Sequence, residues 1–214
     1  MAAPQFKLTY FDGRGLGETA RYLLALGGAN WEDIRLPIQF GEGAPLRPEF
    51  DALKAAGKFP FGQVPILEIE GESAPLAQSR AIEHYLAKQF GLFGSSPVET
   101  ARIHSFGEGI ADFRIEYSKA NFWAKPEDKE ELVAKFYAEV VPKHLALLNS
   151  NVVATDAIHL GDVQLYALVE SILSGGKAPA DFLDAFTNLK ARTDLVASNA
   201  AIKTYIANRK VTPF

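Results

Sequence analysis

The sequence predicts a small α/β domain followed by an all-helical domain. In the first part of the chain, stretches with strand-like alternation are interleaved with stretches of helical spacing. The segment GLFGSSP, residues 91–97, is rich in glycine and serine and has the composition of a linker. Beyond it, each periodic stretch has helical spacing. We therefore expect an α/β domain over residues 1–90 and a helical domain over residues 98–214.

The first domain is expected to follow the order βαβ, a short helix, ββ and a final helix. Its clearest strands are residues 5–10 (QFKLTY), 31–36 (WEDIRL) and 64–70 (VPILEIE), which are rich in β-prone residues. A helix is expected from Leu16 to Gly27, a short helix around Phe50–Lys54, and a further helix from about Gln78 onward. Prolines and glycines predict a loop over residues 37–48.

Four helical stretches are expected in the second domain. They are the apolar stripe Ile103, Phe106, Gly107, Ile110 and Ala111; residues 126–148; the stripe Leu165, Leu168, Val169, Ile172 and Leu173; and the group Ile202, Tyr205 and Ile206. Pro126 suits the first turn of the second helix, because a helix does not use the N–H group at that position.

The composition excludes several classes of protein. The chain of 214 residues has no cysteine, so it has no disulfide, no cysteine nucleophile and no cysteine ligand for zinc. Its net charge of -4 provides no positive field for a nucleic acid, and no apolar run is long enough to span a membrane. The start, MAAPQFKLTY, lacks the basic and apolar regions of a signal peptide, which predicts a cytoplasmic protein.

Two apparent ligand motifs carry little weight. The segment DGRGLGET follows a strand, and Asp33 lies where a dinucleotide fingerprint has its acidic residue, but Glu18 replaces the third glycine. A carboxylate there would repel a pyrophosphate, so no nucleotide is expected. The histidines are His84, His104, His144 and His159. They lack the spacing of metal ligands, so no metal site is expected.

Glu108, Asp112 and Glu116 form an acidic column at steps of four on the first helix of the second domain. Like charges at this spacing destabilise a helix by a few tenths of a kcal/mol, roughly, per pair. The column is either a solvated helix face or the place where a cationic group binds. Asp112 lies opposite the apolar stripe of its helix and is expected to face away from the core.

Gln78 and Ser79 stand at the start of the last helix of the first domain. The N-terminus of a helix presents N–H groups and a partial positive charge, which suit a carboxylate. A serine at such a position is more often a plain helix cap. Both interpretations of Ser79, carboxylate ligand and cap, stay open from the residues alone. Pro65 cannot donate to a strand ladder and therefore indicates an edge position or a special turn.

Three ordered motifs resemble glutathione transferases of the sigma class. They are KLTYFDGRGLGETARYLL, PFGQVPILE and LAQSRAIEHYLA, and they cover residues 5–90 densely. The resemblance implies an N-terminal thioredoxin-like domain and a helical C-terminal domain that shapes an electrophile pocket. It also implies a detoxifying enzyme that conjugates glutathione, as co-substrate, to small hydrophobic electrophiles, with no permanently bound cofactor.

The resemblance implies a role for each matching residue. Tyr10 would donate its hydroxyl to the glutathione sulfur, and the Val64 backbone, ahead of a cis bond to Pro65, would pair with the cysteinyl part. Gln78 and Ser79 would hold the γ-glutamyl carboxylate. The other implied glutathione contacts are Phe50, Lys54, Gln63 and Asp112, the last from the second subunit of a homodimer. The residues implied in the electrophile pocket are Phe11, Gly13, Arg14, Leu16 and Arg114.

Three positions depart from the pattern of the family. Phe50 stands where a tryptophan is common, Leu16 replaces the second arginine of an Arg-Gly-Arg sequence, and His159 replaces the threonine of a Thr-x-x-Asp helix cap. Two other functions stay open. One is a glutathione-dependent isomerase such as a prostaglandin D synthase, which would use the same thiolate. The other is a non-enzymatic, crystallin-like or scaffold protein on the same fold. The absence of cysteine excludes a glutaredoxin-like thiol exchanger.

Overall fold

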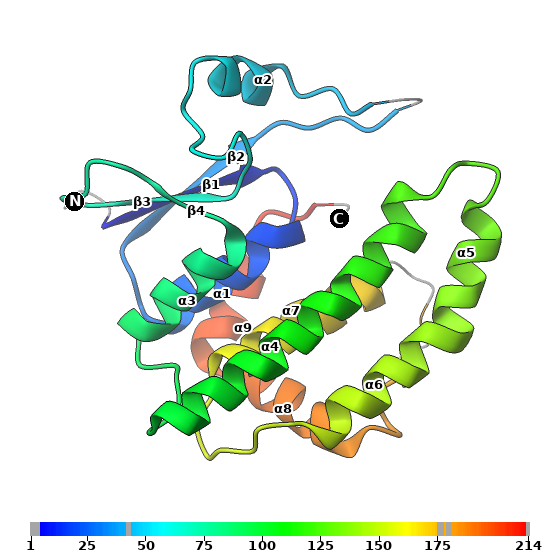
Figure 1. Cartoon of the computed structure of the whole chain (residues 1–214). Helices are drawn as coiled ribbons and strands as arrows, with labels where there is room; N and C mark the ends of the chain where they lie inside the picture. Colours follow the sequence, from blue (N-terminus) through cyan, green and yellow to red (C-terminus); the bar gives the residue numbers. More distant parts are fainter. Residues whose placement is uncertain (1–4, 42–43, 175–177, 179–180, 213–214) are drawn as a thin grey trace. The chain divides into compact units, whose positions relative to one another are not determined.

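The structure is a computed structural model that describes residues 5–41, 44–174, 178 and 181–212. Contacts divide the chain into two compact units, whose elements are labelled in Figure 1. Unit 1 is Met1–Gly91 together with Ala200–Phe214, and unit 2 is Leu92–Asn199. The first division lies close to the expected linker. The segment that begins at Ala200, which was expected in the helical domain, groups by its contacts with unit 1.

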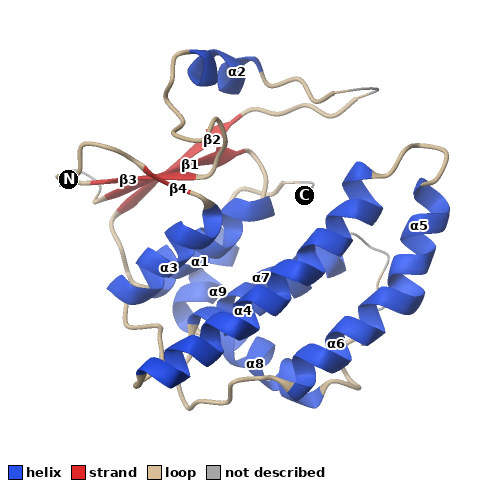
Figure 2. Ribbon diagram, in the orientation of Figure 1, coloured by secondary structure: helices blue, strands red, loops and turns tan. Residues whose placement is uncertain are grey.

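Unit 1 is built on a four-stranded sheet with the strand order β2-β1-β3-β4. The strands are β1 (Phe6–Phe11), β2 (Trp31–Leu36), β3 (Ile66–Ile69) and β4 (Leu76–Ala77). β1 is parallel to β2, whereas β3 is antiparallel to β1 and to β4. The helices are α1 (Glu18–Leu26), α2 (Pro48–Ala55), α3 (Ser79–Gln89) and α9 (Ala200–Asn208), and a 3-10 turn, Gly15–Gly17, precedes α1. Figure 2 shows α1 and α3 on one side of the sheet and α2 on the other.

The central strand β1 carries apolar side chains to both faces of the sheet, because successive side chains of a strand alternate. On the face covered by α1 and α3, the buried ring of Phe6 meets the rings of Tyr85 and Phe90 edge-on. On the opposite face, Phe11 contacts Phe50 of α2 with ring centroids 5.1 Å apart. The sheet therefore lies between helices on both faces. The residues that follow β1 leave the sheet at the C-terminal end of this strand.

The regular elements in the described part of unit 2 are all helices or helical turns. Its helices are α4 (Pro97–Ser118), α5 (Lys129–Lys135), α6 (Val141–Ser150), α7 (Leu160–Ser174) and α8 (Thr187–Ser198), with π-helical turns at Lys119–Trp123 and Phe136–Val140. Both α4 and α8 pack against α7, where Leu165, Leu168 and Ile172 are fully buried. The side chain of Leu173, the last member of the expected stripe, lies outside the described part.

The long helix α4 begins where the expected linker ends. The Ser96 hydroxyl accepts a hydrogen bond from the backbone N–H of Glu99, and the Glu99 carboxylate accepts two from Ser95. This arrangement is similar to a capping box, except that the Glu99 carboxylate bonds the residue before the cap, and Pro97 occupies the first turn. Four members of the expected stripe, Ile103, Phe106, Gly107 and Ile110, are buried, and Phe113 extends the buried face.

Three local expectations need correction. The helix expected over residues 126–148 begins at Lys129 and contains a π-helical turn. The strand expected over residues 64–70 is shorter, because its ladder starts only after Pro65. The helix α8 was not singled out from the sequence, since its buried face mixes Leu189 with the polar residues Arg192 and Thr193.

Candidate functional site

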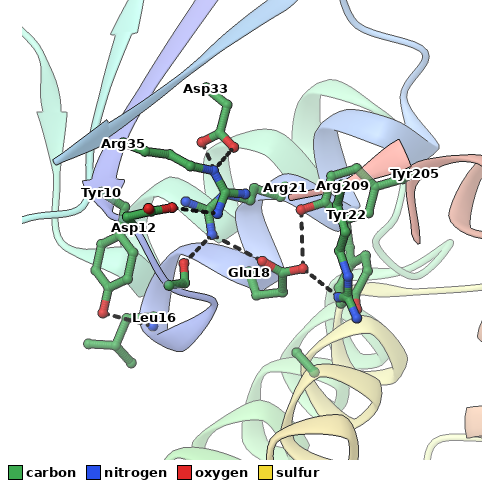
Figure 3. Close-up of polar contacts among 12 residues, drawn as sticks. Tyr10, Asp12, Leu16, Glu18, Arg21, Tyr22, Asp33, Arg35, Tyr205 and Arg209 are labelled. Carbon is green, nitrogen blue, oxygen red and sulfur yellow. Dashed lines mark hydrogen bonds and ion pairs between the residues drawn. The ribbon is translucent and has the colours of Figure 1, made fainter. Parts of the chain in front are cut away.

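Tyr10 lies near the end of β1, where the chain turns toward α1 (Figure 3). Its hydroxyl oxygen accepts a hydrogen bond of 3.1 Å from the backbone N–H of Leu16 in the 3-10 turn. The backbone of this turn can lie close to the Tyr10 side chain because two of its residues are glycines, which have no Cβ atom. A Cβ atom on Gly15 would lie 2.6 Å from the Tyr10 hydroxyl, and one on Gly17 would lie 2.8 Å from the Tyr10 ring. Two glycines thus form a surface against which the tyrosine side chain is held.

A fully buried arginine, Arg21, is hydrogen-bonded to the chain just before this turn. Arg21 donates from Nη1 to the carbonyl oxygen of Gly13 at 2.7 Å. It also forms ion pairs with Glu18 at 3.0 Å and with Asp33 at 3.1 Å. Burial alone would lower the pKa of the Arg21 guanidinium, but the carboxylates of Asp33 and Glu18 outweigh it and raise that pKa. Glu18 and Asp33, the acidic residues of the apparent nucleotide motif, therefore serve to hold an arginine.

A second group of predicted residues comes together around a cavity of about 40 Å³ in the same unit. Its lining consists of Leu16, Phe61, Gln63, Val64, Pro65, Ala77, Gln78 and Ser79. The Val64–Pro65 peptide bond is cis, as the resemblance implied. Leu16 lies between this cavity and the tyrosine, because its backbone N–H donates to the Tyr10 hydroxyl and Leu16 also lines the cavity.

The start of α3 has the features of a ligand site more than those of a capped helix. Gln78 precedes the helix with φ of 74°, a left-handed conformation that is uncommon and strained for a residue other than glycine. Ser79 is the first helical residue, and within the described residues no side chain caps this end. Of the two interpretations left open for Ser79, the plain cap is therefore not supported. The helix presents its N-terminal N–H groups beside the cavity, which suits a carboxylate.

The two positions expected on α2 differ in their surroundings. Phe50 is only 3% exposed and its ring stacks on Phe59 with centroids 5.2 Å apart. Its side chain has no polar atom and packs in the core beneath the cavity, and its expected contact with glutathione stays a prediction. Lys54 is exposed and lies against Gly62, where a Cβ atom would be 3.1 Å from the lysine Cε. Gln63, a residue of the cavity lining, follows directly.

The residues expected in the electrophile pocket are spread over both units. Phe11 packs against Phe50, and Gly13 is buried with its carbonyl bonded to Arg21. Arg14 is partly buried, and Leu16 is 43% exposed beside the cavity. Arg114 lies half-buried on α4 of unit 2.

Asp112 is exposed on α4, opposite the buried stripe, as the sequence indicated. It lines a pocket of about 730 Å³ between α4 and α6, together with Arg102 and His144. Its neighbour in the acidic column, Glu116, pairs with Lys119 at 2.6 Å. One of the three acidic residues of the column is thus paired with a lysine three positions later.

Several charged residues that surround the Tyr10 turn were not expected from the sequence. Asp12 forms ion pairs with Arg35 and with Lys210, and Glu18 forms one with Arg209. No sequence pattern links groups almost two hundred positions apart. Among the described residues, no three or more His, Asp or Glu side chains are grouped as a metal site. None of the helices in that part of the chain is both long and apolar enough to cross a membrane.

Two family matches cover most of the chain. Residues 6–88 match the glutathione S-transferase N-terminal domain, and residues 111–209 match the glutathione S-transferase C-terminal domain. The first match contains Tyr10 and the cavity around Pro65, and the second contains Asp112.

Whole-length relatives agree with these matches. Glutathione S-transferase 1 of Ascaris suum is 37% identical over 99% of this chain and 100% of its own length. Probable glutathione S-transferase 7 of Caenorhabditis elegans is 33% identical, covering 98% of each chain. Among solved structures, prostaglandin synthase D of Nilaparvata lugens is 30% identical with a TM-score of 0.82, covering 98% of this chain and 100% of that one. The glutathione S-transferase of Ascaris lumbricoides is 36% identical with a TM-score of 0.76, covering 99% and 100%. The expected fold class, a thioredoxin-like domain followed by a helical domain, is confirmed.

Proposed function

Because the chain belongs to the glutathione S-transferase family and is an enzyme of that kind, we propose that Tyr10 activates the glutathione thiol for attack on small hydrophobic electrophiles. The observation that carries this proposal is the Tyr10 hydroxyl, held by the Leu16 N–H beside the cis-proline cavity. We place the chain in the sigma-like class, as a cytoplasmic detoxifying enzyme.

The proposed chemistry follows from the pKa of a thiol. A free thiol has a pKa of about 8.5 and is mostly protonated at neutral pH. A hydroxyl that accepts one hydrogen bond can still donate its own proton, so Tyr10 is able to donate to the glutathione sulfur while it accepts from Leu16. A hydrogen bond to the charged form lowers the thiol pKa, and the thiolate is the nucleophile. The thiol proton passes to water, and the thiolate forms a bond to the electrophilic carbon while either a leaving group departs with its electron pair or the electrons of a double bond move to the neighbouring atom, which then takes a proton. The tyrosine keeps its own proton throughout.

The remaining glutathione contacts are proposed from the cavity and its rim. The Val64 backbone, beside Pro65, would pair with the cysteinyl part, and Ser79 with Gln78 would receive the γ-glutamyl carboxylate at the α3 N-terminus. Gln63 and Lys54 lie on the same side of unit 1 and would meet the glycyl end. Phe50, which is buried beneath the cavity, would contribute by apolar packing alone.

We further propose a homodimer in which Asp112 completes the partner's site. Three features of unit 2 support it: Asp112 is exposed, it lines the α4–α6 pocket, and Val98 and Leu147 in the same lining are exposed apolar residues. A carboxylate there could receive the γ-glutamyl ammonium of glutathione. One relative, the solved Na-GST-3 of Necator americanus, 32% identical with a TM-score of 0.79, is described as monomeric, so the oligomeric state of this chain has to be measured.

A glutathione-dependent isomerase is the second candidate function. It is favoured by one observation, the likeness to prostaglandin synthase D of Nilaparvata lugens. The same thiolate would serve both reactions, so the glutathione site does not separate them. Glutathione affinity capture, followed by assays with a panel of electrophiles and endoperoxides, would decide the second substrate.

The test of Tyr10 is the Tyr10→Phe variant. A hydrogen bond to a charged group contributes about 1.5–3 kcal/mol, so we expect kcat to fall roughly 10- to 100-fold while the KM for glutathione stays near that of the parent. Asp112→Asn should instead raise the KM for glutathione, and Glu108→Gln on the same helix is its matched control. A Tyr10→Phe enzyme that conjugates at the parent rate would show that another group activates the thiol.

Mixing the two variants tests the dimer within the same experiment. In a Tyr10→Phe/Asp112→Asn heterodimer, one site carries both defects and the other carries neither, if Asp112 acts across the interface. Mixed dimers should then recover close to half of the parent activity. Activity equal to the average of the two variant homodimers, or a monomer by light scattering at assay concentration, would overturn the shared site.

A further inference from the structure

One buried carboxylate joins the Tyr10 turn to the C-terminal helix of unit 1. Glu18, the first residue of α1, is 2% exposed. Its Oε2 accepts from Arg21 at 3.0 Å, while its Oε1 accepts from the Tyr205 hydroxyl at 3.1 Å and from Arg209 Nη1 at 2.8 Å (Figure 3). Arg209 also donates to the Tyr22 hydroxyl at 2.9 Å. One oxygen of Glu18 therefore pairs within α1, and the other bonds Tyr205 of α9 and Arg209 just after that helix.

A second ion pair reaches the other end of the same turn. Asp12 directly follows β1, and its carboxylate accepts a hydrogen bond from Lys210. Arg35 lies 3.5 Å from the other oxygen of Asp12. The hydrogen bond from Lys210 lowers the pKa of the Asp12 carboxyl, with the positive charge of Arg35 acting in the same direction. Segment 205–210 thus contacts the chain just before and just after the residues that hold Tyr10.

The groups in this network cannot move independently. Arg21, Arg35, Arg209 and Lys210 are shared among the three carboxylates of Asp12, Glu18 and Asp33. Burial, and then the charge of Glu18, raise the pKa of the Tyr205 phenol far above its usual range, so Tyr205 remains a neutral donor. A buried charge that loses a partner must find another or reach water.

Loss of Arg209 would therefore disturb Tyr10 through a short path. Glu18 stands two residues after Leu16, whose N–H holds the Tyr10 hydroxyl. A shift of Glu18 toward its remaining partners would pass along the 3-10 turn to that N–H. The proposed glutathione contacts lie on other segments of unit 1, around Val64 and Ser79.

We infer that α9 and the two residues that follow it, Arg209 and Lys210, are a positioning element for Tyr10. Arg209 and Tyr205, acting through Glu18, and Lys210, acting through Asp12, fix the turn that places the Leu16 N–H on the tyrosine hydroxyl. This inference rests on the proposed function of Tyr10. None of these three residues needs to touch glutathione for the effect.

The test is the Arg209→Ala variant, compared with Lys203→Ala. Lys203 is exposed on α9, six residues before Arg209, so its loss removes the same charge without touching the network. The readout is a pH titration of enzyme-bound glutathione by the ultraviolet absorbance of its thiolate. Because a misplacement of about 1 Å can cost up to 10²-fold, we expect kcat near neutral pH to fall by about 3- to 10-fold in Arg209→Ala. The thiolate should appear at higher pH, the KM for glutathione should stay within about 2-fold, and Lys203→Ala should match the parent.

Two further variants keep the inference testable if Arg209→Ala folds poorly. Arg209→Lys preserves the positive charge beside Glu18 and should recover most of the titration midpoint. Tyr205→Phe removes one donor to Glu18 and should shift the midpoint in the same direction as Arg209→Ala. If the parent forms no thiolate, or if Tyr10→Phe titrates like the parent, the proposed function fails. If Tyr10→Phe behaves as proposed but the Arg209 and Tyr205 variants titrate like the parent, or change only KM, the positioning role of α9 fails alone.

Discussion

Each unit contains a buried carboxylate paired with an arginine, and the two pairs are used differently. In unit 2, Asp162 is fully buried and accepts from the His159 N–H at 2.9 Å and from Arg192 Nε at 2.7 Å. Arg192 also donates to the carbonyl oxygens of Thr155 and Ala157. All of these contacts close one loop onto α7 and α8. In unit 1, Glu18 bridges two helices beside the turn that carries Tyr10.

The two units also differ in how they treat a serine at a helix start. Ser96 caps α4 in unit 2, whereas Ser79 begins α3 in unit 1 without capping it. The serine of unit 2 thus bonds to its own helix, and the serine of unit 1 lines the cavity of the candidate site. We propose that the same residue types stabilise the fold in unit 2 and serve the glutathione site in unit 1.

The sharpest way to break this comparison is to remove each carboxylate in turn. Removing one partner of a buried ion pair costs about 3–5 kcal/mol, so Asp162→Ala should lose about that much stability in urea unfolding. Asp194→Ala, in the exposed pair with Lys190, should lose no more than about 1 kcal/mol. The titration of bound thiolate should be unchanged in both variants that remain folded.

Glu18→Gln should lose less stability, about 1.5–3 kcal/mol, because Arg21 keeps Asp33 and Arg209 keeps the Tyr22 hydroxyl. It should also move the thiolate titration to higher pH. If Asp162→Ala moved that titration as far as Glu18→Gln does, the distinction between the two units would be lost.

The two serines provide a smaller and matched contrast. Ser79→Ala should raise the KM for glutathione by about tenfold, since a hydrogen bond to a charged group contributes about 1.5–3 kcal/mol. Its stability should remain that of the parent, because Ser79 is not a cap. Ser96→Ala should do the opposite and cost about 1 kcal/mol of stability with no change in KM. A parent-like KM in Ser79→Ala would return that residue to a structural role.

The smallest expected effect concerns acid stability. The hydrogen bond from Lys210 lowers the pKa of Asp12, so this carboxylate stabilises the fold above its ordinary pKa of about 4. That contribution is lost as the pH falls through the lowered pKa, where both the folded and unfolded states become protonated. Urea midpoints of Asp12→Asn and the parent should therefore differ near pH 7 and converge in strong acid. The exposed Glu99 of unit 2, whose pKa the hydroxyl of Ser95 lowers, is the comparison residue.

The local parts of the fold could be predicted because short patterns determine them. Strands at residues 5–10 and 31–36 match β1 and β2 to within one residue at each end. The helix α8 could not be predicted, because the polar residues Arg192 and Thr193 interrupt its apolar stripe. Arg192 is buried against Asp162 and loop carbonyl oxygens, which lie 30 or more positions earlier in the sequence.

The candidate site divides in the same way. Tyr10 and the pair Gln78-Ser79 follow from sequence motifs, whereas the contact between Glu18 and Arg209 joins positions 191 residues apart. Phe50 was placed in the glutathione set by resemblance alone, and no sequence pattern indicates that its ring packs against Phe11 and Phe59.

The grouping of α9 with unit 1 has a consequence for synthesis on the ribosome. Unit 2 is inserted between two pieces of unit 1, so Glu18 meets Arg209 only after another 191 residues have been added. At 5–20 residues per second, that delay is about 10–40 s. The residues of the sheet and of the Arg21 ion pairs are all made well before this time ends, whereas the Tyr10 turn still lacks its contacts with α9 and the residues after it. A nascent chain arrested just before Ala200 should therefore be cleaved by protease more readily near that turn than the released protein.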